Sequence, residues 1–167
     1  QQGVPYAKGI GIFAKIFMET FPLIPTEEAE RLNNPNIREQ FIEQIFILKR
    51  WREISHNKKL SKLIQFHTEH KFIFMSHSNI LLNKLGQLVA SHTKNIDINM
   101  IFKEYEKIMM EGLKKYKTTT KKHTNVLEHI MGFLKNTLKT KDKQYILDII
   151  NQYYKGYVPL IVPITLI

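Results

Sequence analysis

The chain has 167 residues, enough for one domain or for one domain with part of a second. It contains no cysteine, so disulfides, zinc–thiolate sites, iron–sulfur clusters and cysteine nucleophiles are excluded within it. Residues 1–34 are slightly acidic, so the formal net charge of +10 comes from the residues after them. Such an excess attracts polyanions, most often nucleic acid, although a merely solvated lysine-rich surface has the same composition.

Residues 1–34 differ from the rest of the chain. A short apolar run, Ile12–Phe17, can form the core of a short helix, and Pro22 and Pro25 then interrupt the chain. This segment is too short to build its own core. We expect it either to pack on the main body or to be the tail of a neighbouring domain.

Apolar residues at helical spacing predict about six helices in residues 35–167. The first starts at Asn34-Pro35, an N-cap followed by proline at the first helical position. The six helices are expected at about 35–54, 58–75, from the cap Ser78 to Val89, 101–116, from the cap Thr124 to Leu138, and 141–154. An apolar tail, Pro159–Ile167, follows. It is the one segment where the pattern also allows a strand instead of a helix. We therefore expect an all-α protein, a compact helical bundle.

The spacing also predicts which sides of these helices are buried. In the first helix the buried side carries Phe41, Ile45 and Leu48, flanked by Ile42 and Phe46, with Trp51 closing it. In the second helix His67 and Lys71 fall within the apolar stripe that also includes Leu60, Leu63, Ile64 and Phe74.

The stretch Lys121–Lys135 carries two different sides. Leu127, Ile130, Met131 and Leu134 form an apolar stripe, while Asn125 and His129 point another way, together with Gly132. A helical glycine costs about 0.5–1 kcal/mol relative to alanine. We expect another helix or a ligand to lie close to Gly132.

The most basic part of the chain leads into this stretch. It runs from Lys114 to His123, contains Lys114, Lys115, Lys117, Lys121 and Lys122, and has no acidic residue. We expect a loop that enters a helix N-terminus, where ammonium groups, hydroxyls and free N–H groups suit phosphate. Tyr116 adds a ring that can stack on an exposed base.

Seven histidines raise the question of metal binding or catalysis. His67 and His70 are three residues apart, and His77, His123 and His129 can approach them in space. There is no HExxH motif, no nucleophile elbow and no cysteine, so we expect no metal site and no catalytic residue in this chain. A buried histidine with a hydrogen-bond partner and a histidine that contacts a ligand remain the two readings.

Three blocks of the sequence resemble a known family. They are FHTEHKFIFMSHS (Phe66–Ser78), HTNVLEHIMGFLK (His123–Lys135) and YYKGYVPLIVPITLI (Tyr153–Ile167). Together they are similar to the YbgA-type domain, a bacterial domain of unknown function, over roughly residues 38–167. The stretch Gly9–Leu32 resembles the end of the desulfidase domain that often precedes it. The expected division is therefore 1–34 for a desulfidase-like tail and linker, and 35–167 for the YbgA-type domain.

The resemblance also implies a function. In such fusions the N-terminal domain resembles thiouracil desulfidases and holds a [4Fe–4S] cluster on three cysteines, and the fused proteins are implied to act on 4-thiouridine in tRNA. The YbgA-type domain is then expected to bind tRNA beside a cytoplasmic catalytic domain. Lacking cysteine, this chain is expected to hold no cofactor and to be inactive alone. The alternatives are a protein-interaction module for the desulfidase domain and a small histidine-dependent enzyme.

The predicted RNA-binding residues combine the three blocks with the basic segment, and no contact with a membrane is expected. They are His67, His70, Lys71, His77, Lys114, Lys115, Lys117, Lys121, Lys122, His123, Asn125, His129 and Lys135.

Overall fold

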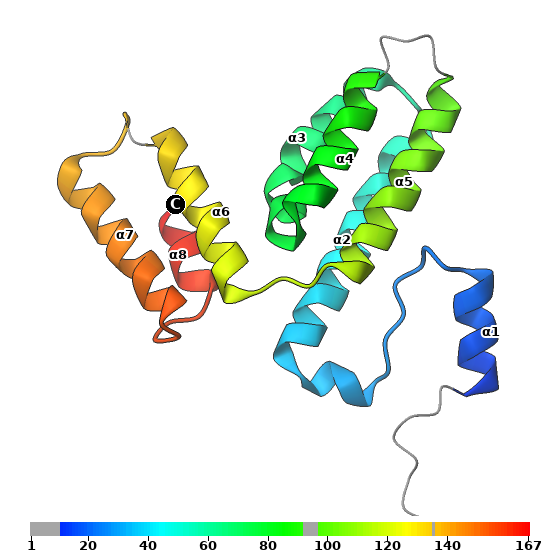
Figure 1. Ribbon diagram of the computed structural model, residues 1–167, viewed down its shortest axis with the longest axis horizontal. Coiled ribbons are helices and arrows are strands. Elements are labelled where there is room, and N and C mark those ends of the chain that lie inside the picture. Colours follow the sequence, from blue (N-terminus) through cyan, green and yellow to red (C-terminus); the bar gives the residue numbers. More distant parts are fainter. Residues whose placement is uncertain (1–10, 92–96, 135) are drawn as a thin grey trace, which may run out of the picture.

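A computed structural model of the chain describes residues 11–91, 97–134 and 136–167. All regular structure within these residues is helical, which confirms the predicted all-α class (Figure 1). The elements in chain order are α1 (Ile12–Thr20), the 3-10 helix η1 (Glu30–Asn33), α2 (Pro35–Ser55), α3 (Leu60–His77), α4 (Asn79–Ala90), α5 (Ile98–Lys115), α6 (Thr120–Leu134), α7 (Thr140–Tyr154) and α8 (Ile161–Leu166). The two short end helices, α1 and α8, make up the difference from the predicted six.

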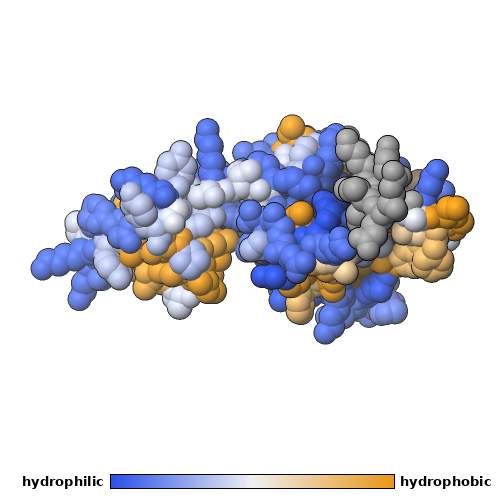
Figure 2. Space-filling model, turned by 90° about the horizontal axis from the view of Figure 1, so that it is seen from below, coloured by the Kyte–Doolittle hydropathy of each residue, from blue (hydrophilic) through white to orange (hydrophobic). Residues whose placement is uncertain are grey.

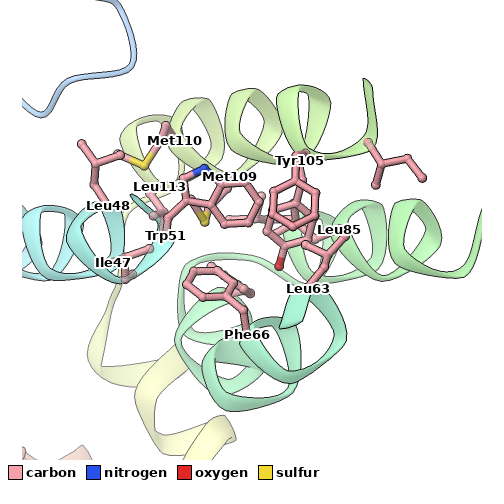
Figure 3. Close-up of a cluster of buried hydrophobic side chains, with 14 residues drawn as sticks. Ile47, Leu48, Trp51, Leu63, Phe66, Leu85, Tyr105, Met109, Met110 and Leu113 are labelled. Atoms are coloured by element: carbon pink, nitrogen blue, oxygen red, sulfur yellow. The ribbon is translucent and has the colours of Figure 1, made fainter. Parts of the chain in front are cut away.

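Helices α2–α5 form one bundle around the larger core. Trp51 lies at its centre, 1% exposed, with its ring stacked on Tyr105 and in contact with Phe66 and Phe102 (Figure 3). Buried aromatic rings supply large apolar areas, and offset or edge contacts between rings add to the stability. This bundle holds the larger of the two cores.

Helices α6, α7 and α8 form a second unit beside this bundle (Figure 1). Its smaller core consists of Leu127 and Met131 of α6 with Ile146, Ile150 and Tyr153 of α7. The unit is joined to the bundle by the segment between α5 and α6 and by packing of α6 against α3. The α3–α6 contact therefore sets the position of α6.

Side-chain caps start several helices where the sequence predicts them. Asn34 accepts hydrogen bonds from the amides of Asn36 and Ile37, and Pro35 follows it at the first helical position. Ser78 likewise accepts from the amide of Ile80 at the start of α4. Each cap satisfies an amide that has no partner within its helix.

The predicted start of α6 is wrong. Thr124 is not a cap: α6 begins at Thr120, and the hydroxyl oxygen of Thr119 accepts from the amide of Lys122 at 3.3 Å. Threonines stand at both positions, and the earlier one is used: only residues 116–119 separate the end of α5 from the start of α6. Lys121 and Lys122 therefore belong to the first turn of a helix rather than to a loop.

The predicted buried side of α2 is only partly right. Leu48 and Trp51 are buried, but Ile45 and Phe46 are 42% and 55% exposed, while Ile47 is 1% exposed. This helix has apolar residues on two sides, and its packing against α3 and α5 selects the side that contains Ile47. In α3 the stripe is likewise turned, so that His70 is buried and Ile64 is 45% exposed.

The remaining apolar surface gathers at two places. Figure 2 shows one orange area on the α6–α8 unit, on the side toward the bundle, and another at the opposite end of the molecule, where α1 lies. Ile161 and Ile164 of α8 are 62% and 52% exposed, and Ile12 and Phe13 of α1 are 81% and 83% exposed. Among the residues described, none of the helices combines the length and apolar content that a membrane crossing requires.

Candidate nucleic-acid interface

Two of the predicted histidines are buried in the bundle. His70 is 2% exposed; its Nδ1 donates to the carbonyl of Phe66 at 2.8 Å, and its Nε2 accepts from Nη1 of Arg50 at 3.3 Å. Burial lowers the pKa of His70, which favours this neutral ring. With both nitrogens paired and the ring enclosed, His70 is placed to hold α3 against α2 rather than to meet a ligand.

His77 is also enclosed, with an exposed fraction of 0%. Its Nδ1 faces the carbonyl of Tyr116, and its Nε2 lies 3.2 Å from Oε2 of Glu43. Both ring nitrogens of His77 therefore have a partner. His77 thus ties the end of α3 to α2 and to the α5–α6 segment.

Lys122 completes this attachment. Its Nζ donates to the carbonyl of His77 and to the carbonyl of Lys117, each at 2.6 Å. Gln40 donates to the hydroxyl of Thr118 at 3.2 Å. We call these contacts of His77, Lys122 and Gln40 the linker clasp; they fix the short segment between α5 and α6 from three sides.

His67 and His123 are half-buried and each bonds a tyrosine. Nδ1 of His67 lies 3.0 Å from the hydroxyl of Tyr105, and Nδ1 of His123 lies 2.8 Å from the hydroxyl of Tyr153. Burial lowers the pKa of both histidines and raises the pKa of both tyrosines. At neutral pH both members of each histidine–tyrosine pair are therefore uncharged, and a hydrogen bond without an ionic contribution joins them.

Four further predicted lysines lie on the surface at the α5–α6 junction, and Nζ of Lys115 lies 5.4 Å from the ring centroid of Tyr116. Lys114 and Lys115 lie in the last turn of α5, Lys117 in the connecting segment and Lys121 in the first turn of α6, and all four are exposed. We call these four lysines the basic group. The linker clasp holds the backbone between them; Lys114 and Lys117 border a hollow beside α1 and α2, and Lys121 borders one between α6 and α7.

A row of exposed side chains continues from the basic group along α6. Lys121, Asn125, His129 and Phe133 follow one another at four-residue intervals, and all are exposed. Each step of four residues advances about 40° around a helix of 3.6 residues per turn, so the row is about 18 Å long and turns by about 120°, from Lys121 beside α7 to Phe133 beside α3. We call it the α6 row.

The end of the α6 row is an aromatic cluster shared with α3. The ring of Phe133 is 62% exposed and lies 5.2 Å from His129 and 6.2 Å from Phe72, between ring centroids. Nζ of Lys71 lies 5.1 Å from the centroid of Phe72 and 5.4 Å from that of Phe133. The predicted residues Lys71 and His129 are thus brought together by the packing of α3 on α6.

Sequence reasoning missed Phe72 and Phe133 as members of this site. Phe133 stands four residues after His129, and this spacing could have identified it from the sequence. No feature of the sequence could have identified Phe72, because only the packing of α3 on α6 brings it close to Phe133. Gly132, beside Phe133, has nothing within 4 Å of the position a Cβ would take, so the expected close helix is absent there. Lys135 lies outside the described residues.

The described residues contain no group of three or more histidine, aspartate or glutamate side chains placed to hold a metal ion. What the surface offers is a set of ammonium groups, an amide, an imidazole and open aromatic rings along one helix. These groups suit phosphate contact and base stacking.

Comparison with known proteins gives the family. A family model described as "Protein of unknown function (DUF1722)" matches residues 71–167, more than half of the chain. The chain belongs to the DUF1722 family. The DUF1722 match begins at Lys71 and includes the basic group and the whole α6 row.

Among curated proteins, this DUF1722 chain is similar to the "Uncharacterized protein YbgA" of Escherichia coli (strain K12). The two are 26% identical over 109 residues, which cover 65% of this chain and 64% of that protein. The chain thus spans less than two thirds of the length of this relative. The resemblance to a YbgA-type domain is confirmed. No solved structure matches the chain.

Proposed function

We propose that this DUF1722 chain binds RNA, with tRNA as its ligand, along α6. The observation that carries the proposal is the exposed α6 row, which begins in the basic group and ends at the open ring of Phe133. Lysines at one end supply sequence-independent attraction for phosphates, and a ring at the other end supplies a stacking surface for an unpaired base.

The aromatic cluster suits RNA better than a plain charged surface does. The ring of Phe133 is 62% exposed and contacts the rings of His129 and Phe72, so it belongs to an exposed aromatic patch rather than standing alone. Lys71 beside the rings of Phe72 and Phe133 adds a cation where a phosphate follows a stacked base. The open space beside Gly132 leaves room for a flat group to approach the backbone.

The resemblance stated above supplies the larger proposal. In it, this DUF1722 domain presents tRNA to a desulfidase-like catalytic domain, which acts on 4-thiouridine and holds the [4Fe–4S] cluster. This chain has no cysteine for such a cluster, so its own part is binding and orientation. The slightly acidic residues 1–34 are then the tail of that neighbouring domain.

The test is binding of bulk tRNA to the purified chain, measured by fluorescence anisotropy at 50 and 200 mM salt. We expect Lys117→Glu/Lys121→Glu to weaken binding by at least about tenfold and to lower the salt slope by about two. Lys122 is left unchanged because it holds two carbonyl groups.

The matched control is Lys58→Glu/Lys59→Glu, which changes the charge equally at the other end of the bundle. Nζ of Lys58 donates to Asn99 at the start of α5, about 24 Å along that helix from Lys115. Equal losses in both double variants would mean that only net charge matters, and absence of tRNA binding would end the proposal.

Exposed apolar residues on α1 and α8 favour a second candidate, a module that docks on the desulfidase domain. It predicts tight association with the isolated desulfidase domain and no binding of RNA. The anisotropy measurement therefore separates the two candidates.

A further inference from the structure

A hollow lies between the two units, bordered by α2, α3, α6 and the start and middle of α8. Its volume is about 670 Å³, and most of its lining is apolar, including Phe72 and Ile73 of α3, Ile130 of α6 and Ile164 of α8. Sites for small molecules are of this size and composition. The hollow adjoins the α6 row, because Phe72 lines it and also contacts Phe133.

Two of the six polar side chains in the lining, Glu43 and His123, give the hollow a chemical preference; the other four are Arg38, Glu39, Ser76 and Thr118. Glu43 carries a carboxylate that is 23% exposed and is held by His77, and it acts electrostatically on His123. His123 lines the same hollow. A hydrogen-bond acceptor and an imidazole therefore stand near each other in apolar surroundings.

The proton on His123 can be assigned from its partners. Burial raises the pKa of Tyr153, so its hydroxyl keeps its proton at neutral pH. The donor of the pair is therefore assigned to this hydroxyl, which lies 2.8 Å from Nδ1 of His123. In the neutral ring this leaves Nε2 of His123 as an N–H donor.

We propose that this hollow receives one unpaired nucleobase that carries a carbonyl group beside a ring N–H, that is uracil or guanine. The donor on His123 matches the carbonyl, and the carboxylate of Glu43 matches the ring N–H. Cytosine and adenine present an acceptor nitrogen at that position, which faces the carboxylate unfavourably. This inference rests on the proposed RNA binding and adds base selection to it.

The surroundings of the hollow fit an extruded nucleotide. Arg38 is exposed and lies in the lining, where its guanidinium is suited to the phosphate of the bound nucleotide. The loops of folded RNA offer unpaired bases that such a pocket can take up. With phosphates held by the basic group, a neighbouring base is kept close to the hollow.

The experiment compares hexanucleotides of equal charge by fluorescence anisotropy at one salt concentration. We expect oligo-U to bind about tenfold more tightly than oligo-C or oligo-A, and one guanosine in the middle of oligo-C to recover most of the difference. Equal affinity for all of them, with salt-sensitive binding intact, would overturn the pocket and leave the RNA-binding proposal standing. No binding of any RNA would overturn that proposal itself.

Two variants connect the preference to this hollow. Glu43→Gln offers both a donor and an acceptor, so the ratio of oligo-U to oligo-C affinity should fall toward one, a change that loss of folded protein alone does not produce. Ile164→Trp fills the hollow and should also abolish the preference. Its control is Ile161→Trp, on the same helix but outside the lining and 62% exposed, which should keep the preference. A ratio that is unchanged in Glu43→Gln and Ile164→Trp contradicts the inference.

Discussion

At the scale of single residues, two helical glycines have opposite surroundings. A Cβ added at Gly112 in α5 would lie 2.3 Å from Cδ1 of Leu81, a side chain that is only 1% exposed. A Cβ added at Gly132 in α6 meets nothing within 4 Å. The first glycine permits close packing of α4 on α5, and the second does not serve packing at all.

We therefore predict opposite effects of alanine at these positions. Gly112→Ala should lower the free energy of unfolding by about 1–3 kcal/mol through overpacking. Gly132→Ala should raise it by about 0.5–1 kcal/mol, because alanine is the better helix former. Urea unfolding of both variants checks this, and a change of the same sign in both would contradict it.

Adjacent lysines at the start of α6 also differ in role. Lys122 donates to two carbonyl groups of the linker clasp, whereas the side chain of Lys121 is exposed. Lys122→Met should lower the free energy of unfolding by about 1.5–3 kcal/mol, the range for hydrogen bonds to a charged group. Lys121→Met should leave stability within about 0.5 kcal/mol and weaken binding of tRNA.

The measurements are urea unfolding and tRNA anisotropy on the same two proteins. Methionine keeps most of the aliphatic length of lysine, so the comparison isolates the ammonium group. Equal stability of the two variants would contradict the role of Lys122 in the linker clasp.

At the scale of elements, the start of α6 depends on one of two nearby threonines. Thr119→Ala removes the oxygen that accepts from the amide of Lys122 and should cost about 1 kcal/mol of stability. Thr124→Val should be neutral or stabilising, because the buried hydroxyl of Thr124 has no hydrogen-bond partner. Thermal unfolding of both variants tests whether Thr119 is the cap of α6. A larger loss of stability in Thr124→Val than in Thr119→Ala would show that Thr124 is the cap instead.

The sequence predicted the elements better than their orientations. Helix starts at Pro35 and Asn79 follow from local caps, which depend on a few neighbouring residues. The buried side of α2 depends instead on α3 and α5, and a helix with apolar residues on two sides does not reveal which one packs. The choice between Thr119 and Thr124 is likewise made by the path of the preceding segment.

The residues of the site could be predicted only in part, because some depend on local sequence features and others on contacts between distant residues. Its lysines and His129 stand out in the sequence because they are dense or follow a four-residue interval. The burial of His70 and His77 and the use of Lys122 as a clasp depend on contacts between residues far apart in the chain. Phe72 enters the site only through the packing of α3 on α6.

At the scale of the whole molecule, the two units have cores of unequal size. The bundle core contains the stacked rings around Trp51, whereas the α6–α8 core is formed by five buried side chains, among which Tyr153 is 8% exposed. We predict that amides of α6 and α7 exchange with solvent faster than those of α3 and α5, because local opening follows the apolar area buried. Hydrogen exchange followed by mass spectrometry checks this, and equal protection would contradict it.

Stability of the whole molecule should decrease in mild acid. Burial lowers the pKa of His67, His70 and His123 below the ordinary value of 6.5, so the folded state holds these rings neutral. Below about pH 6.5 the unfolded chain binds the protons more readily, and stability falls until the folded pKa values are reached. The charges that act on these rings include Lys71 at His67, Arg50 and Glu69 at His70, and Glu43 at His123.

Thermal unfolding at pH 7.5 and pH 5.5 measures this effect, and we expect the lower midpoint at pH 5.5. His70→Gln should narrow the difference between the two midpoints, since one of the three rings no longer titrates. A midpoint that is higher at pH 5.5 would show that the sign is wrong.

The position of Trp51 has a practical consequence for every one of these measurements. It is the single tryptophan of the chain, and it is sealed against Tyr105 in the centre of the bundle. Its fluorescence emission therefore reports on the folding of that bundle, and we expect it not to change when a ligand binds at the surface of α6. The variant Phe133→Trp would add an exposed indole on α6, which emits at longer wavelength than the buried Trp51. RNA binding at α6 and unfolding of the bundle can then be followed by fluorescence in the same sample.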